Sequence, residues 1–137
     1  YSLEDLKEMS AVTGWKILST CGSLKERSSA LIGSQAEECL ERFHVDKAFI
    51  SCKGVDAEHG FSDSSDAHAA VKRKMIAAAS QVFFAVDSSK FGKLSFTSIS
   101  GFSGVDAVIT ERCPNEEWNR IFIANDIECL FPRGEQK

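Results

Sequence analysis

The chain has 137 residues, 43% of them hydrophobic and 26% charged, and its formal net charge is −4. This length and balance are typical of one soluble domain that can bury its own core. The acidic charge argues against nucleic-acid binding through the net field of this chain, because such binding rests on neutralising phosphates with Lys and Arg.

The absence of targeting signals and the spacing of the cysteines indicate where the protein works and the state of its thiols. No apolar run approaches the roughly 18 residues of a membrane helix, and the acidic residues 1–5 lack the basic segment of a signal peptide. We therefore expect a cytoplasmic protein with no membrane partner. The spacing of the cysteines is wide and contains no C-x-x-C pair, which predicts reduced thiols and no zinc knuckle. The five positions are Cys21, Cys39, Cys52, Cys113 and Cys129.

The first third of the chain predicts helix, strand and helix in turn. Ser2 is placed to cap the first helix, with Asp5 three residues on. Residues 15–21 alternate and are rich in β-forming side chains, which predicts a strand, and the polar residues 23–29 predict a loop. Ser34 has the spacing of a cap for the next helix.

Two apolar strands are predicted in the middle of the chain, at 47–51 and 82–86, with a helix at 67–80 between them. Residues 54–65 hold two glycines and many Asp and Ser residues. That composition predicts a long exposed loop.

The helix predicted at 67–80 has one apolar face. Asp66 is placed to cap it, and Val71 and Met75 fall on the same side. Lys72 lies at the edge of this apolar stripe, where a lysine usually lays its stem on apolar surface and keeps its charge in water.

Further strands are predicted at 96–99, 105–110 and 127–131, and a further helix at 115–124. Strands that alternate with helices along the whole chain predict an α/β fold with a parallel-rich sheet and flanking helices. Large aromatic side chains on these elements are predicted to lie in the core: Phe83, Phe84, Trp118 and Phe122.

The best candidate site is the turn Asp87-Ser-Ser-Lys90, which follows the strand at 82–86. Loops that leave the carboxyl ends of parallel strands hold the ligand in such sheets. The Lys90 ammonium suits a phosphate. Ser88 and Ser89 can donate hydrogen bonds, and Asp87 can accept them from sugar hydroxyls. The alternative is a polar turn in which Asp87 only satisfies nearby backbone amides.

Three residues of the loop after strand 47–51 are further candidates: Lys53, Gly54 and Asp56. Gly54 would let a ligand approach the backbone closely. Lys72 could also reach a ligand from the rim of its helix. The three histidines have no metal-ligand spacing, and no nucleotide-binding or nucleophile motif is present. We therefore assign no metal, no cofactor and no catalytic residue.

Five segments occur in an order that resembles the C-terminal sensor domain of DeoR-type bacterial transcriptional regulators. The resemblance covers roughly residues 15–131, and its most specific part is the Asp-x-Ser-Lys-Phe-Gly element together with the helix before it. The segments are Val45-Asp-Lys-Ala-Phe-Ile50, Gly54-Val-Asp-Ala-Glu-His-Gly-Phe61, the helix around Val71-Lys72, Asp87-Ser-Ser-Lys-Phe-Gly92 and Val105-Asp-Ala-Val-Ile-Thr110.

The resemblance implies a fold similar to ribose-5-phosphate isomerase and the CoA-transferase-like proteins. It implies a regulator, expected to be a repressor, of sugar or nucleoside catabolism, with a phosphorylated sugar as effector and an oligomeric sensor domain. Operator DNA would be bound by an upstream winged helix-turn-helix. By the resemblance, the effector is bound by Asp87, Ser89, Lys90 and Lys72, and less securely by Lys53, Gly54 and Asp56.

The sequence departs from the family pattern in three places. It has no Gly-Thr-Thr-like phosphate loop and no helix-turn-helix, so we expect residues 1–137 to be a sensor domain truncated at its N-terminus. Cys21-Gly22 stands where the family has a glycine pair.

Two other functions remain open at this point. A sugar-phosphate isomerase of the same fold needs a carboxylate base. Asp87 could serve as that base, but no second acid stands near it in sequence and the resemblance is to regulators. The other alternative is an oligomerisation module with a vestigial pocket. We expect a sensor and not an enzyme.

Overall fold

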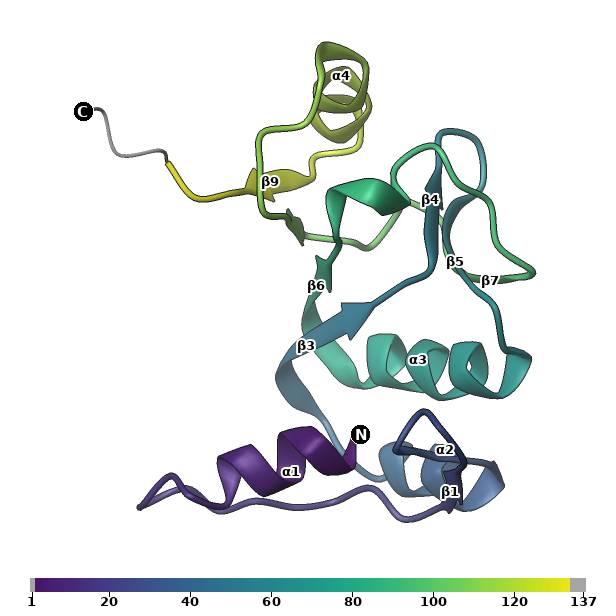
Figure 1. Cartoon of the computed structure of the whole chain (residues 1–137), viewed down its shortest axis with the longest axis vertical. Helices are drawn as coiled ribbons and strands as arrows, with labels where there is room; N and C mark the ends of the chain where they lie inside the picture. Colours follow the sequence, from purple (N-terminus) through teal and green to yellow (C-terminus); the bar gives the residue numbers. More distant parts are fainter. Residues whose placement is uncertain (1, 134–137) are drawn as a thin grey trace. The chain divides into compact units, whose positions relative to one another are not determined.

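The computed structural model describes residues 2–133. The chain divides into two compact units, an N-terminal unit that ends at Phe43 and a C-terminal unit that begins at His44. Each unit has its own helices and strands (Figure 1).

The N-terminal unit consists of two short helices and a two-stranded hairpin. Helix α1 is Leu3–Met9, and the Ser2 hydroxyl caps it by accepting a 3.3 Å hydrogen bond from the Asp5 amide, as predicted. Strands β1 (Ser23–Lys25) and β2 (Ala30–Ile32) pair antiparallel, and helix α2 is Ser34–Leu40.

Three predictions for this unit are wrong. Residues 15–22 form no strand, and residues 23–29, predicted as a loop, supply β1 and the turn of the hairpin. The physical reason is that a strand needs a partner, and β2 pairs with β1 instead. Gly33 occupies the cap position of α2 without a side-chain hydrogen bond, so Ser34 is the first helical residue and not the cap.

The C-terminal unit is built on a four-stranded parallel sheet in the order β3-β6-β8-β9. The strands are β3 (Val45–Ser51), β6 (Ala79–Ala85), β8 (Ala107–Ile109) and β9 (Glu128–Leu130). The α/β prediction is therefore confirmed, and so are the predicted strands at 47–51 and 82–86, which are neighbours in this sheet.

Two helices pack against these strands. Helix α3 (Asp66–Ala78) contacts β3 and β6, and helix α4 (Glu116–Ala124) contacts β9. Both are close to their predicted ranges. Ser65, and not Asp66, occupies the cap position of α3, whereas the Asn115 side chain caps α4 by accepting a 3.0 Å hydrogen bond from the Trp118 amide.

A second, antiparallel sheet has the order β4-β5-β7, with strands β4 (Gly54–Asp56), β5 (Gly60–Asp63) and β7 (Thr97–Ser100). The prediction of an exposed loop at 54–65 is therefore wrong. Phe61 is buried, and so are the polar residues Ser62 and Asp63. Burial of Ser62 is tolerated because its hydroxyl bonds to the Gly54 carbonyl at 3.3 Å and accepts from the Ser95 amide at 2.9 Å.

The core of the C-terminal unit lies between the two sheets and α4. Phe61 of β5 stacks on Phe84 of β6 with ring centroids 3.8 Å apart, and both side chains are fully buried. Trp118 and Phe122 of α4 complete this cluster, as predicted. Phe83 is only half-buried, because it points to the other face of the sheet and stacks there on Phe49.

Candidate functional site

The candidate site is the edge of the sheet at which β3, β6 and β8 end. These strands are parallel neighbours, so their carboxyl ends share one edge. Lys53 and Gly54 follow β3, the turn Asp87 to Lys90 follows β6, and Glu111 and Arg112 follow β8.

The segment after β6 is a single 3₁₀ turn, η1 (Ser88–Lys90). Asp87 caps it, because its carboxylate accepts a 2.8 Å hydrogen bond from the Ser89 amide. Hydrogen bonds from the Ser89 hydroxyl and amide hold the pKa of Asp87 below its usual value. The carboxylate is thus ionised and partly engaged by the turn, while Lys90 is half-buried and Ser89 is exposed.

The loop after β8 joins this turn. Glu111 accepts from the Ser88 amide at 2.9 and 3.2 Å and from the Thr110 hydroxyl at 3.0 Å. Hydrogen bonds from the Ser88 hydroxyl, from the backbone amide of Glu111 itself and from the Ser88 amide lower the pKa of Glu111 to about 2. Arg112 donates through Nε to the Ser88 hydroxyl at 2.9 Å.

Sequence reasoning singled out neither Glu111 nor Arg112. The available signal was their place directly after a predicted parallel strand, which is the same argument that singled out Asp87. The structure therefore adds a carboxylate and a guanidinium to the candidate site.

The loop after β3 lies against the segment that follows η1. The Gly92 amide donates to the Val55 carbonyl at 2.9 Å. A Cβ atom on Gly54 would lie 2.4 Å from the Lys93 carbonyl oxygen. Gly54 thus permits close approach of the chain's own backbone, and no ligand is needed to explain it. Lys53 beside it is exposed.

Lys72 lies in a different environment from the one predicted. Its ammonium is buried and contacts the Asp63 carboxylate at 2.5 Å, and the two side chains are 3% and 2% exposed. The prediction that Lys72 keeps its charge in water is wrong, because Asp63 replaces that water. Burial alone would raise the pKa of Asp63, but the hydrogen bond and charge of Lys72 outweigh it and hold that pKa below its ordinary value.

Cys52 is a buried residue between β3 and Lys53. Burial raises the pKa of its thiol to about 11, although the charge of Lys72, the Gly54 amide and the charge of Lys90 oppose the increase. The Lys72 ammonium itself is engaged by Asp63.

Asp56 has a local role in the structure. It lies at the turn between β4 and β5, where it accepts from the Glu58 and His59 amides at 3.0 and 2.9 Å and pairs with His59 Nδ1 at 2.7 Å. Among residues 2–133, no hydrogen bond or ion pair found for Asp56 joins it to the turn after β6.

The arrangement at the edge of the sheet combines three kinds of group. The cations are Lys53, Lys90 and Arg112; hydroxyls come from Ser88 and Ser89; the carboxylates are Asp87 and Glu111. Cations and hydroxyls suit a phosphate, and carboxylates suit sugar hydroxyls. The described residues contain no group of three or more His, Cys, Asp or Glu side chains able to hold a metal ion.

Comparison with known proteins decides the family. The family model described as the DeoR C terminal sensor domain matches residues 1–112. The chain belongs to the DeoR family. Within residues 2–133, no helix is long and apolar enough to cross a membrane.

Several transcriptional regulators are similar to this DeoR-family sensor domain. The HTH-type transcriptional regulator YulB of Bacillus subtilis is 38% identical, over 80% of this chain and 43% of its own length. The HTH-type transcriptional repressor GlcR of the same organism is 36% identical, over 84% of this chain and 44% of its own length. The L-fucose operon activator of Haemophilus influenzae is 30% identical, over 71% of this chain and 39% of its own length.

The chain thus spans less than half the length of these relatives. The family consists of transcriptional regulators and not of enzymes, and both a repressor and an activator are found among the relatives.

Proposed function

We propose that this sensor domain binds a phosphorylated sugar at the carboxyl edge of β3, β6 and β8, and that binding controls a regulator of sugar catabolism, expected to be a repressor. The observation that carries the proposal is the hydrogen-bonded junction of the turn after β6 with the loop after β8, where Glu111 and Arg112 both contact Ser88. This junction holds Arg112 next to the turn that carries Lys90.

The charges at this edge fit a ligand with a phosphate at one end and hydroxyls at the other. Lys90 and Arg112 supply positive charge for the phosphate. Asp87, which η1 leaves partly engaged, supplies an ionised acceptor for a sugar hydroxyl. Gly54 acts through the fold, by letting the backbone of Lys93 approach.

The full regulator has a division of labour in this proposal. The chain carries a net charge of −4, which is unfavourable for binding the phosphates of operator DNA. A helix-turn-helix module outside residues 1–137 supplies that contact, and the sensor domain supplies oligomerisation and the effector response. Two half-sites bound by a dimer gain from effective concentration.

Titration calorimetry on the full regulator tests the binding site. Ribose 5-phosphate and glucose 6-phosphate serve as probes, with inorganic phosphate for comparison. Lys90→Ala removes one charge-assisted contact, worth about 1.5–3 kcal/mol, so we expect affinity for the bound sugar phosphate to fall roughly tenfold to a hundredfold.

Lys47→Ala is the matched control, because Lys47 is an exposed lysine of β3 that precedes the carboxyl edge. Its affinity should equal that of the wild type. Equal affinities for Lys90→Ala and wild type would refute the site. No heat with any sugar phosphate would favour an oligomerisation module with a vestigial pocket, and turnover of a sugar phosphate would favour an isomerase.

A further inference from the structure

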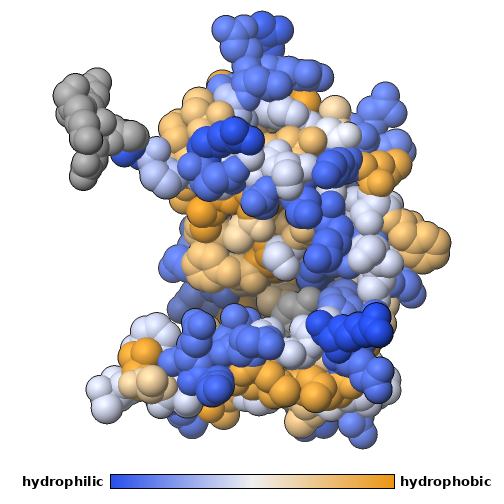
Figure 2. Space-filling view, in the orientation of Figure 1, coloured by the Kyte–Doolittle hydropathy of each residue, from blue (hydrophilic) through white to orange (hydrophobic). Residues whose placement is uncertain are grey.

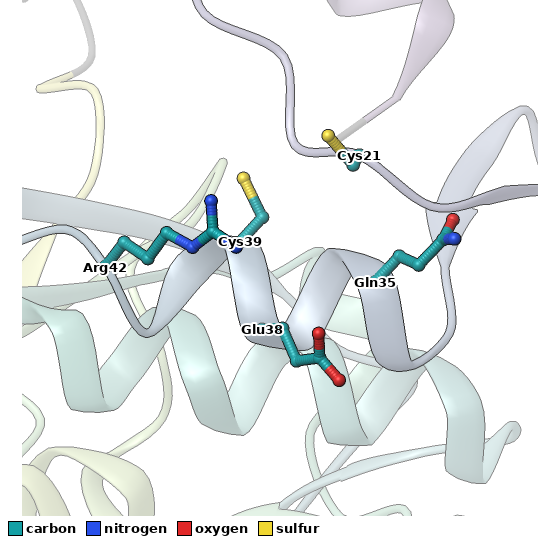
Figure 3. A pocket seen from close by; sticks show the side chains of 5 residues that line it. All are labelled: Cys21, Gln35, Glu38, Cys39 and Arg42. Atoms are coloured by element: carbon teal, nitrogen blue, oxygen red, sulfur yellow. The ribbon is translucent and has the colours of Figure 1, made fainter.

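A hollow of about 320 Å³ lies within the N-terminal unit, between the loop that precedes β1 and helix α2. Its lining includes two cysteines, Cys21 from the loop and Cys39 from α2, and both are free thiols. Figure 3 shows the sulfur of Cys39 extending from α2 toward the loop that carries Cys21.

The backbone brings the two cysteines together through Gly22. A Cβ atom on Gly22 would lie 2.9 Å from the Cβ of Ala36 and 2.7 Å from the Ile32 carbonyl oxygen, so the loop touches α2 at this point. Cys39 is three residues after Ala36, and residues three apart lie on the same side of a helix. Cys21, directly before Gly22, is therefore beside the side of α2 that carries Cys39.

The two thiols differ in access to solvent. Cys21 is exposed and Cys39 is half-buried. Arg42 and Glu38 also line the hollow. Redox-active pairs usually have an attacking cysteine that is exposed to solvent and a resolving cysteine next to it.

We propose that Cys21 and Cys39 are a thiol pair that forms a disulfide by exchange with a low-molecular-weight disulfide such as oxidised glutathione. The Cys21 thiolate attacks one sulfur of the small disulfide, whose S–S bond breaks and releases one small thiol. The Cys39 thiolate then attacks the Cys21 sulfur of the mixed disulfide and releases the second small thiol.

The exchange balances in atoms and electrons. Two protein thiols and one small disulfide give one protein disulfide and two small thiols. The protons of Cys21 and Cys39 end on the released thiols, and the small disulfide takes the two electrons. The new bond ties the loop before β1 to α2, in a unit whose buried hydrophobic residues, among those described, are Ala30 and Ala36.

The other cysteines are less suited to this exchange. Burial raises the pKa of Cys52 to about 11, which leaves little thiolate. Burial also raises the pKa of Cys129, and the nearby Cys113 adds to that increase. Cys113 is exposed, so it is the natural comparison for a thiol that reacts but has a poorer partner.

The test uses the 137-residue chain, oxidised glutathione and peptide mass spectrometry. Trypsin places each cysteine in its own peptide, so the proposed disulfide joins peptide 17–25 to peptide 28–42. Folded wild-type protein is incubated with oxidised glutathione, its remaining thiols are blocked with an alkylating agent, and the chain is digested. We expect the 17–25/28–42 species to be the main product, and dithiothreitol to abolish it.

Two serine variants assign the roles. Cys39→Ser should accumulate glutathione on Cys21, because nothing resolves the mixed disulfide, and Cys113→Ser should form the 17–25/28–42 link as the wild type does. Circular dichroism checks that the variants fold. The proposal is overturned if the main link joins peptides 113–120 and 121–133, if Cys21 carries only unresolved glutathione in the wild type, or if the proposed link forms only in denaturant.

Discussion

The two units of the chain have similar kinds of secondary structure but very different interiors. The C-terminal unit encloses a continuous cluster that includes Ile50, Phe61, Phe84 and Phe122. In the described part of the N-terminal unit, the buried hydrophobic residues are two alanines. A sequence can therefore form helices and strands without also forming a packed core.

The N-terminal unit leaves large apolar side chains at its surface. Trp15, Leu18 and Leu24 are 64%, 66% and 54% exposed, and Figure 2 shows apolar surface over this unit. Helix α1 has a serine cap and two acidic residues in its first turn, yet it buries no residue. Local signals start the helix, but they add little stability without a packed face. Substitutions should thus be costly in one unit and mild in the other.

The largest contrast is expected from truncating a large side chain in each unit. Phe61 is 0% exposed and stacks on Phe84, so Phe61→Ala should lower the free energy of unfolding by about 3–5 kcal/mol. Leu24→Ala should lower it by less than about 0.5 kcal/mol, because that side chain is already in water.

Urea titration in a Trp15→Phe background measures the effect of Phe61→Ala, since the fluorescence then comes from Trp118 in the C-terminal unit. Hydrogen exchange at the amides of β1 and β2 measures the effect of Leu24→Ala, because it reports opening of the N-terminal unit itself. A mild Phe61→Ala variant would show that the cluster around Phe61 contributes much less than its burial implies.

The next largest effect concerns the buried pair of Lys72 and Asp63. Lys72→Met leaves the Asp63 carboxylate buried without its partner and should cost about 3 kcal/mol or more. Arg120→Met is the control for an exposed ion pair. Arg120 pairs with Glu116 at 3.3 Å, with side chains 79% and 90% exposed, and such exposed pairs contribute up to about 1 kcal/mol.

Replacing both partners distinguishes the loss of the ion pair from the cost of one buried charge without a partner. The double variant Lys72→Met with Asp63→Leu should be less destabilised than Lys72→Met alone, because it leaves no unpaired charge in the interior. If the double variant loses the sum of the two single losses, each side chain acts independently and the pair has no special role.

The same pair predicts a dependence of stability on pH. The folded pKa of Asp63 lies below its ordinary value of 3.8. The unfolded chain therefore binds the proton more readily, and the stabilisation is complete above about pH 4 and is lost as pH falls through the folded pKa. Wild type should lose stability on acidification more steeply than Asp63→Asn. Glu111 and Asp87 also have lowered pKa values, but wild type and Asp63→Asn both keep these two residues. Parallel curves of unfolding free energy against pH for the two proteins would therefore contradict the prediction.

The fold was predictable where its signals are local. The apolar runs of β3 and β6 and the apolar residues Trp118 and Phe122 of α4 are each readable within a few residues. The hairpin at 54–63 was missed because its buried polar residues have distant partners. Asp63 pairs with Lys72, and Ser62 bonds to Ser95, 33 residues away. From a single sequence, a polar residue is predicted to be exposed unless its hydrogen-bond or ion-pair partner is known.

The site was predictable in part for the same reason. The turn Asp87 to Lys90 was found because it directly follows an apolar strand. Glu111 was missed because its hydrogen bond to Ser88 depends on β8 being the neighbour of β6. Strand order is set by packing of the whole sheet, and no local pattern encodes it. The roles of Asp87, Ser89 and Lys90 toward an effector stay predictions.

The smallest predicted effects concern the two helix caps. The Asn115 side chain accepts from the Trp118 amide at 3.0 Å, and α4 buries Trp118 and Phe122. Losing a cap costs about 1 kcal/mol where the helix end is part of the cooperative structure, so Asn115→Ala should lower the urea midpoint reported by Trp118.

Ser2→Ala removes an equivalent cap from α1, where the hydroxyl accepts from the Asp5 amide at 3.3 Å. Because α1 buries no residue, its loss should leave the midpoint reported by Trp118 unchanged and should speed hydrogen exchange at the Asp5 amide. If Ser2→Ala lowers that midpoint as much as Asn115→Ala does, the N-terminal unit unfolds together with the C-terminal unit. The difference in packing between the two units would then produce no difference in their stability.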